Sequence, residues 1–525
     1  MEPAPPKTHL AVLLLTLLVI VSPFMGGIIV SAQTPLASPV TASAYDPDDL
    51  LAIKPGLREE IAAALPPGMT VYDIALTFPE DTSDRTLEGS QEIVYTNTTG
   101  EVLNALPFRL YANSADPENN AVTIDEVSVG GAEVSVELSV DNSVAMVALP
   151  APLAPGEEAR IDMGFTTHVP QDEKLHYGIF NHASDTGTWS LAHWYPVVAG
   201  RDRETGWMLE PTSEYGDPIF TETGLYTVTV TAPENLTFIT SGVEIGSEAA
   251  GGIATTTFNA SPSRDFVMFA DADMKSVARE VSGTTVTSWY EPGHGEAGKA
   301  ALTWSAQALR LFNNLLGEYP YRQLQLSEIE IYNAAGVEFP QLIALSRGYY
   351  QTEPRLESPG YFEFTVAHEV VHEWFYNLVG NNQYAHAFID EGLTNYLSAR
   401  VYFEEFYGEQ EADQVVRDFL VRPFRNAVVS GVDPVVDFPT DEFPSQQDYV
   451  VAAYSKGALG FSAIHEAIGD DAFFDALQVY VQDFRFRVAT PEDLLAVFKA
   501  VSNIPIEPIW NYWFKERNGD LDAIG

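Results

Sequence analysis

Between residues 66 and 275, apolar and polar residues alternate in short segments, which is the pattern of half-buried β-strands. Two clear examples are TVYDIALTF, which begins at Thr70, and GLYTVTVTAPENLTF, which begins at Gly224. Gly, Pro, Asn and Asp separate such segments from one another. Many short strands at this spacing predict an antiparallel β sandwich or saddle-shaped sheet. No residue cluster in this region has the spacing of a catalytic site.

The pattern changes near residue 276. A last strand, TTVTSWYEP, leads into EAGKAALTWSAQALRLFNNLLGEYPY, where apolar residues recur at three- and four-residue steps and a Gly-Glu-Tyr-Pro sequence ends the helix. The strand LQLSEIEIYN and the segment AAGVEFPQLIALS follow, and the rest of the chain has helical periodicity. We therefore predict an N-terminal β domain over 66–275 and a second, mainly α-helical domain over 276–525.

The first 65 residues fit neither domain. After Lys7, residues 10–30 are almost entirely apolar, and the chain then becomes rich in Pro, Ser and Thr. An apolar block behind a weakly basic start is typical of an export signal, here with cleavage near Gln33, and this block is also long enough to span a membrane. We expect residues 1–32 to be a signal peptide or membrane anchor and residues 33–65 to be a tether. The protein would then be exported, and either secreted or anchored at the outer face of the membrane.

Composition and charge narrow the classes of function. The chain has 525 residues, of which 46% are hydrophobic, so two or three domains with large cores are expected. It has no Cys, so disulfides are excluded and any metal site must use His and carboxylates. The formal charge of −47 disfavours nucleic acid and anionic lipid as partners, because both would be repelled. These features do not indicate an oligomeric state.

The segment AHEVVHEWF, from Ala367 to Phe375, places two His and two Glu in an otherwise apolar helix that we predict over roughly 361–378. A buried carboxylate and two imidazoles are costly unless something satisfies them. His368 and His372 are four residues apart and therefore lie on one face of the helix. Together they can bind Zn²⁺ as neutral imidazoles, with Glu369 close enough to act on a water at the metal. A locally satisfied core cluster is the alternative.

A third ligand has to come from another part of the chain. Glu391, in FIDEGLTNYLSARVYF, follows His372 after eighteen intervening residues, which is enough to end one helix and bring a second alongside. Asp390 can cap that second helix and so place Glu391 near its start. His386, in the intervening loop, is the rival ligand, and we favour Glu391 because it lies on a rigid element. Three nitrogen and oxygen ligands with one open position favour a single Zn²⁺ ion.

HExxH followed by eighteen residues and a Glu resembles the pattern of the aminopeptidase N family of zinc metallopeptidases. AGVEF, from Ala335 to Phe339, is similar to the Gly-Ala-Met-Glu-Asn exopeptidase motif of that family. AYSKGALGF, from Ala453 to Phe461, is similar to the segment that supplies its catalytic Tyr. The resemblance covers roughly residues 66–520. It implies an N-terminal β domain followed by a thermolysin-like, mainly α-helical catalytic domain, in a short form without the large C-terminal helical domain of many members.

The resemblance also implies roles for individual residues. Glu369 would be the general base, and Tyr454 would donate a hydrogen bond to the oxyanion of the tetrahedral intermediate. Glu338 would bind the free α-ammonium of the substrate, and Gly336 would leave room for the substrate backbone along the strand. Asn395, one turn beyond the third ligand, either orients a ligand or is a surface residue of its helix.

Two departures from the family pattern keep the substrate selectivity open. Phe339 and Pro340 follow Glu338 where the family motif has Asn, and GTWSLAHWYPVVAG has no Gln or Glu that matches the amine-binding contribution of the N-terminal domain. The leading interpretation is an aminopeptidase that acts on peptides with a free N-terminus. The alternatives are a zinc endopeptidase of broader specificity and a catalytically inactive surface protein that holds a metal and binds peptides.

Overall fold

The computed structural model describes residues 45–115, 120–213, 215–216, 219–352, 360–517 and 519. The expected signal or anchor, residues 1–32, lies outside these ranges. Within them, no helix combines the length and the apolar character needed to cross a bilayer.

Residues 45–65, assigned above to a tether, are folded against the rest of the protein. They contain a short 3₁₀ helix, Pro47–Asp49, and helix α1, Arg58–Ala64. Ile53 is fully buried and forms a β-bridge with Tyr321, and the backbone N–H of Lys54 donates to the carbonyl of Pro320 at 2.9 Å. Hydrophobic patterning does not indicate this fold, because the apolar residues of the segment recur with neither a helical nor a strand period.

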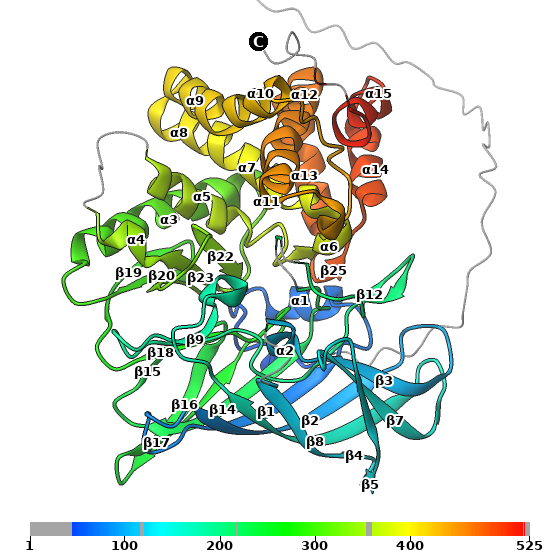
Figure 1. The fold of residues 1–525 in the computed structure, drawn as a ribbon. Coiled ribbons are helices and arrows are strands. Elements are labelled where there is room, and N and C mark those ends of the chain that lie inside the picture. The colour runs from blue at the N-terminus through cyan, green and yellow to red at the C-terminus, as the bar shows by residue number, and fades with distance from the viewer. Residues whose placement is uncertain are drawn as a thin grey trace, which may run out of the picture. The chain divides into compact units, whose positions relative to one another are not determined.

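The N-terminal region is built from β-sheets, as expected from its alternating pattern (Figure 1). In β1, Tyr72, Ile74 and Leu76 face the core while the residues between them are exposed. The largest sheet has the order β16-β17-β14-β1-β2-β8-β4-β5. Its strands are β1 Val71–Thr77, β2 Thr86–Thr96, β4 Val122–Val129, β5 Ala132–Glu133, β8 Glu158–His168, β14 Leu225–Pro233, β16 Val243–Ala250 and β17 Ile253–Asn259.

Two four-stranded sheets, β15-β18-β10-β9 and β11-β3-β7-β6, and a small pair, β12-β13, complete this region. Side chains from the large sheet and both four-stranded sheets meet in one apolar core, which contains Trp189 and Trp194. One pairing departs from the predicted antiparallel arrangement: β1 and β14 are parallel, which a long connection between them permits. The remaining elements are α2 Tyr111–Ala115, β3 Leu103–Arg109, β6 Val136–Ser139, β7 Val144–Leu153, a 3₁₀ turn Leu175–Gly178, β9 Phe180–His182, β10 Trp189–Leu191, β11 Val197–Val198, β12 Arg201–Asp202, β13 Gly206–Trp207, β15 Thr237–Thr240 and β18 Met268–Asp271.

The C-terminal region begins with a five-stranded sheet of order β19-β20-β21-β23-β22, on which helices α3 and α5 pack (Figure 1). Helix α3 ends where predicted, since Gly317 follows it with φ of 108°. The elements of this layer are β19 Lys275–Val281, β20 Thr284–Tyr290, α3 Gly295–Leu316, β21 Gln323–Ile329, β22 Gly336–Phe339, β23 Leu342–Ser346, α4 Arg347–Tyr350 and α5 Tyr361–Val371.

The rest of the chain is mainly helical. Its α-helices are α6 Gln383–His386, α7 Glu391–Tyr396, α8 Phe403–Tyr407, α9 Glu409–Val416, α10 Arg422–Val429, α11 Gln446–Val450, α12 Gly457–Ile468, α13 Asp470–Phe484, α14 Pro491–Val501 and α15 Glu507–Trp510. Other segments are the 3₁₀ turns Ala387–Ile389 and Thr440–Glu442, the π-helical segments Leu397–Tyr402, Arg417–Val421, Val451–Lys456 and Asn511–Lys515, and the strand pair β24 Val379–Gly380 and β25 Arg487–Val488.

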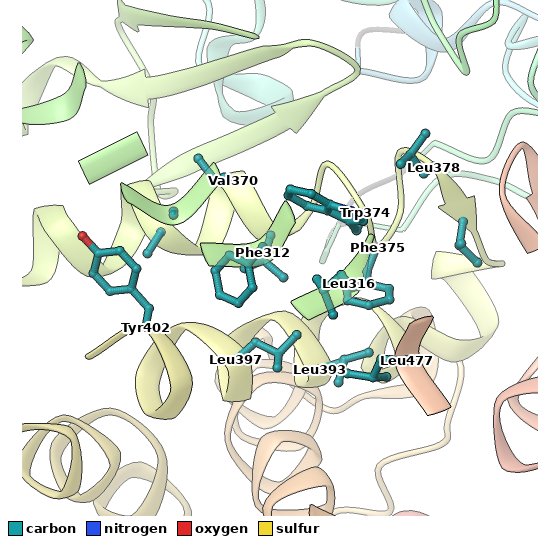
Figure 2. Packing of buried hydrophobic residues seen from close by; sticks show 14 of the residues in the cluster. Phe312, Leu316, Val370, Trp374, Phe375, Leu378, Leu393, Leu397, Tyr402 and Leu477 are labelled. Carbon is teal, nitrogen blue, oxygen red and sulfur yellow. The ribbon is translucent and has the colours of Figure 1, made fainter. Parts of the chain in front are cut away.

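Helix α5 lies inside the core of this region. Every residue from Phe362 to Val371 is buried, as expected for a helix that is apolar on most of its circumference. Phe312 and Leu316 of α3, Val370 of α5 and Leu393 of α7 contribute to the same core (Figure 2). Close packing of this kind holds the helix that carries the HExxH sequence in a fixed position.

Candidate active site

The structure brings the three predicted metal ligands together. His368 lies in α5, His372 directly follows that helix, and Glu391 is the first residue of α7. The two Nε2 atoms are 3.0 Å apart, and Oε2 of Glu391 is 3.3 Å from each of them. All three side chains are buried. His386, the rival ligand, points elsewhere, because its Nδ1 is 2.5 Å from Oδ1 of Asp437.

The spacing of these three atoms fits a zinc ion. Zinc bound tetrahedrally at about 2.0–2.1 Å places any two of its ligand atoms about 3.3 Å apart. The three separations observed here, 3.0, 3.3 and 3.3 Å, are close to that value. Oε2 of Glu391 is also buried without a hydrogen-bond partner among the described residues, although it faces the two imidazoles. The residues present can therefore hold Zn²⁺ and leave a fourth position open.

The electrostatics around His372 favour a cation. Burial lowers the pKa of its imidazole, but Glu338, Glu391 and Glu369 together raise that pKa well above the ordinary value. Burial raises the pKa of Glu391, but the facing imidazoles of His368 and His372 lower it to about 2. A position that so strongly stabilises positive charge at an imidazole also suits a divalent metal.

The chain around His372 fixes the direction of its ring. Nδ1 of His372 donates to the carbonyl of Phe375 at 2.8 Å, so Nε2 faces the other ligands. The helix was predicted to continue to residue 378, but it ends at Val371, and the backbone turns sharply at Tyr376, where φ is 113°. Beyond Val371 the backbone N–H groups bond to carbonyls three, four or five residues back in irregular turns, which sequence periodicity does not show.

Residues next to the ligands hold them in place. Asp390 does not cap α7 with its side chain, as had been expected. Instead it accepts hydrogen bonds from Asn381 at 3.2 Å and from Gln383 at 2.7 Å. Asn395 is buried, so it is not a surface residue, and its amide donates to the carbonyl of Tyr454 at 2.9 Å. Burial lowers the pKa of His368, and Glu391 opposes that effect. Asn395 lines the same cavity as His368.

Glu369 and Gly336 are in direct steric contact across the site. Glu369 is buried and lines the same cavity as His368 and Glu391. A Cβ atom at position 336 would lie 2.5 Å from Oε1 of Glu369, much closer than atoms can approach. Position 336 in β22 therefore has to be glycine, because a side chain there would clash with the Glu369 carboxylate. This is a second reason for the glycine, besides the predicted room for the substrate backbone.

Tyr454 lies in the π-helical segment Val451–Lys456 and reaches the third ligand. Its hydroxyl donates to Oε1 of Glu391, and its ring stacks on that of His368 with centroids 6.0 Å apart. Burial and then the charge of Glu391 raise the pKa of this phenol well above 10, so it keeps its proton and remains a donor. Lys456 anchors the segment through an ion pair with Asp433 at 2.8 Å.

A cavity of about 380 Å³ is lined by two of the ligands, His368 and Glu391, and by residues from both regions of the protein. Glu338 faces this cavity from β22, and its Oε1 is buried without a hydrogen-bond partner among the described residues. Burial raises the pKa of Glu338, while His372 lowers it. Sequence reasoning missed several other lining residues. Tyr177, Ile179 and Phe419 come from distant segments with no motif, and Tyr361 and Phe364 lie in α5 itself but resemble the other apolar residues of that helix.

Comparisons with known proteins agree with this geometry. Residues 300–513 match the Peptidase family M1 domain. Aminopeptidase M1-D of Oryza sativa subsp. japonica is 24% identical over 303 residues, which cover 56% of this chain and 34% of that protein. Aminopeptidase 2, mitochondrial, of Saccharomyces cerevisiae is 24% identical over 321 residues, which cover 59% of this chain and 33% of that protein. The chain thus matches about a third of the length of these curated relatives.

Solved structures share the fold over most of the chain. The crystal structure of an M1 zinc metallopeptidase from Deinococcus radiodurans has a TM-score of 0.63 and 20% identity, and the match covers 86% of this chain and 95% of that one. A mutant from the same organism, bound to a Tyr-Ser-Ala substrate, has a TM-score of 0.62 and 20% identity, with 87% and 97% covered.

The β-rich region and the helical region together have the two-domain fold of the M1 zinc metallopeptidases, and the three predicted ligands are spaced for one zinc ion. The resemblance to the aminopeptidase N family is thereby confirmed.

Proposed function

We propose that this protein is a zinc-dependent aminopeptidase that releases residues from the free N-terminus of peptides. The observation that carries the proposal is the position of Glu338. Its buried Oε1 has no hydrogen-bond partner among the described residues and lies 3.9 Å from Nδ1 of His372, and Glu338 lines one cavity with Glu369 and with the ligands His368 and Glu391. A free α-ammonium would pair with that oxygen, whereas an internal peptide bond presents no cation to it.

His368, His372 and Glu391 would hold the zinc ion, which when bound supplies a Lewis acid and lowers the pKa of an attacking water. Glu369 would take a proton from that water and pass it to the leaving amine. Gly336 leaves the space in which the Glu369 carboxylate lies. The phenol of Tyr454, which stays protonated, would donate a hydrogen bond to the developing oxyanion.

The test compares peptide substrates that carry a free amine with the same peptides after N-acetylation, with and without a chelator. We expect chelator-sensitive hydrolysis of the free-amine peptides and little hydrolysis of the acetylated ones. Glu338→Ala should lower kcat/KM for free-amine peptides by about 10²-fold, the scale expected when one partner of a buried ion pair is removed. The same change should leave kcat/KM for acetylated peptides unaltered.

Each alternative function gives a different result in this experiment. Equal rates on both peptide sets would indicate the zinc endopeptidase, and full activity of Glu369→Gln would contradict the role of the base. An absence of hydrolysis with every substrate, in a protein that holds zinc and binds peptides, would indicate the inactive surface protein.

A further inference from the structure

A second, smaller hollow of about 170 Å³ adjoins the active-site cavity. Tyr177, Gly216, Asn333 and Gln446 line both spaces. The side chain of Tyr177 is the largest of the four, and its hydroxyl donates to the carbonyl of Gly216 at 3.2 Å. Tyr177 therefore forms part of the wall that separates the two hollows.

The backbone that presents Tyr177 is strained. His176, Tyr177 and Gly178 have φ values of 44°, 59° and 77°, so three consecutive residues are left-handed and two of them carry side chains. Such a conformation persists only where the surrounding structure holds it, and it is common at functional sites. Here the backbone N–H of Tyr332 donates to the carbonyl of Tyr177 at 2.9 Å, and Gly178 packs so closely on the Tyr332 ring that a Cβ would lie 2.8 Å from it.

Tyr177 and Glu338 both line the active-site cavity. Tyr177 packs on an apolar cluster that contains Ile179 and Val337. Another part of the lining is aromatic and comes from α5 and the segment after α9, where Phe364 and Phe419 are in edge contact with centroids 4.9 Å apart. If the α-ammonium of a peptide pairs with Glu338, a residue or acyl group added before it needs further space, and the hollow that adjoins the cavity at Tyr177 is one such space.

We propose that Tyr177 is the partition that confines this enzyme to free N-termini, by closing the passage from the cavity into the adjoining hollow. This inference rests on the aminopeptidase function proposed above. In this view, the ring of Tyr177 excludes chains that are extended at the N-terminus, and Glu338 attracts the α-ammonium. The two contributions are separable by substitution because the two residues come from different segments of the chain.

The experiment uses Tyr177→Gly, because glycine adopts a φ of 59° without strain, and the substitution should therefore fold while it removes the ring. We expect the ratio of kcat/KM for N-acetylated to free-amine peptides to rise at least tenfold. Tyr177→Phe keeps the ring and should leave the ratio unchanged. Leu175→Gly loosens the same loop at an exposed side chain and should also leave the ratio unchanged.

A binding measurement gives a second readout that does not depend on turnover. In an inactive Glu369→Gln background, calorimetry should show that Tyr177→Gly strengthens binding of an N-acetylated tripeptide at least tenfold, with little change for the free-amine tripeptide. An unchanged ratio and unchanged binding in the folded variant would overturn the role of Tyr177, and so would an equal rise caused by Leu175→Gly.

These outcomes also separate the inference from the proposed function. If the wild-type protein discriminates against acetylated peptides and Glu338→Ala does not, the aminopeptidase function is supported, whatever the result for Tyr177→Gly. A wild-type protein that cleaves both peptide sets equally contradicts the aminopeptidase and the partition together.

Discussion

Substitution of Gly336 by alanine should disable the enzyme without removing a functional group. The new Cβ atom would lie 2.5, 2.7 and 2.8 Å from Oε1, Cδ and Cγ of Glu369, whereas ordinary contacts begin at 3.4 Å. The Glu369 carboxylate would therefore have to move by about 0.9 Å, the difference between 3.4 and 2.5 Å. A misplacement of about 1 Å in a catalytic group costs on the order of 10²-fold in rate.

The assay is kcat/KM on a free-amine peptide, combined with zinc content and a thermal unfolding curve. We expect Gly336→Ala to lose about 10²-fold in kcat/KM while zinc content stays at the wild-type level, because the change does not touch His368, His372 or Glu391. Gly348→Ala is the matched control: it lies in α4, and a Cβ there meets nothing closer than 3.7 Å. Activity of Gly336→Ala within threefold of wild type would refute the argument that Glu369 and the glycine share one space.

Three further predictions concern the scaffold and the ligands. Gly380→Ala would place a Cβ 2.2 Å from the buried guanidinium carbon of Arg264, so we expect a loss of about 1–3 kcal/mol in the free energy of unfolding, measured in urea; unchanged stability would contradict this packing. Burial raises the pKa of Glu363 above its ordinary 4.5, against hydrogen bonds from Tyr407 and Tyr402, so its ionisation costs folded-state stability as pH rises above that value. We expect the free energy of unfolding of Glu363→Gln to rise relative to that of the wild type between pH 4 and pH 8. A difference that does not change with pH would contradict the raised pKa of Glu363. Glu391→Ala should purify with little zinc, whereas His386→Ala should retain it; equal zinc content in both would contradict the ligand choice.

The parts of the site that could be predicted depend on local geometry. Two histidines four residues apart in an apolar helix must share one face, so the pairing of His368 and His372 follows from helical periodicity. Glu391 could be placed because the eighteen residues after His372 are enough to turn the chain and bring the start of another helix alongside α5. Glu338 and Tyr454 were identified only through family motifs, since spacing alone does not distinguish them from packed residues.

The remainder depends on contacts between distant segments. The buried segment around Ile53 folds because it bridges to Tyr321, far along the chain. The helix α5 ends early, in irregular backbone turns that lead to Tyr376 with its φ of 113°. The wall at Tyr177 requires three consecutive left-handed residues that no composition or periodicity indicates.

The central claim is that one metal ion lies among His368, His372 and Glu391. Anomalous diffraction from crystals of the purified protein, recorded on both sides of the zinc absorption edge, tests it most directly. The account predicts a single zinc peak about 2.0–2.1 Å from the two Nε2 atoms and from Oε2 of Glu391. No peak at that position in zinc-supplemented crystals, or a peak that Glu391 does not reach, would contradict it.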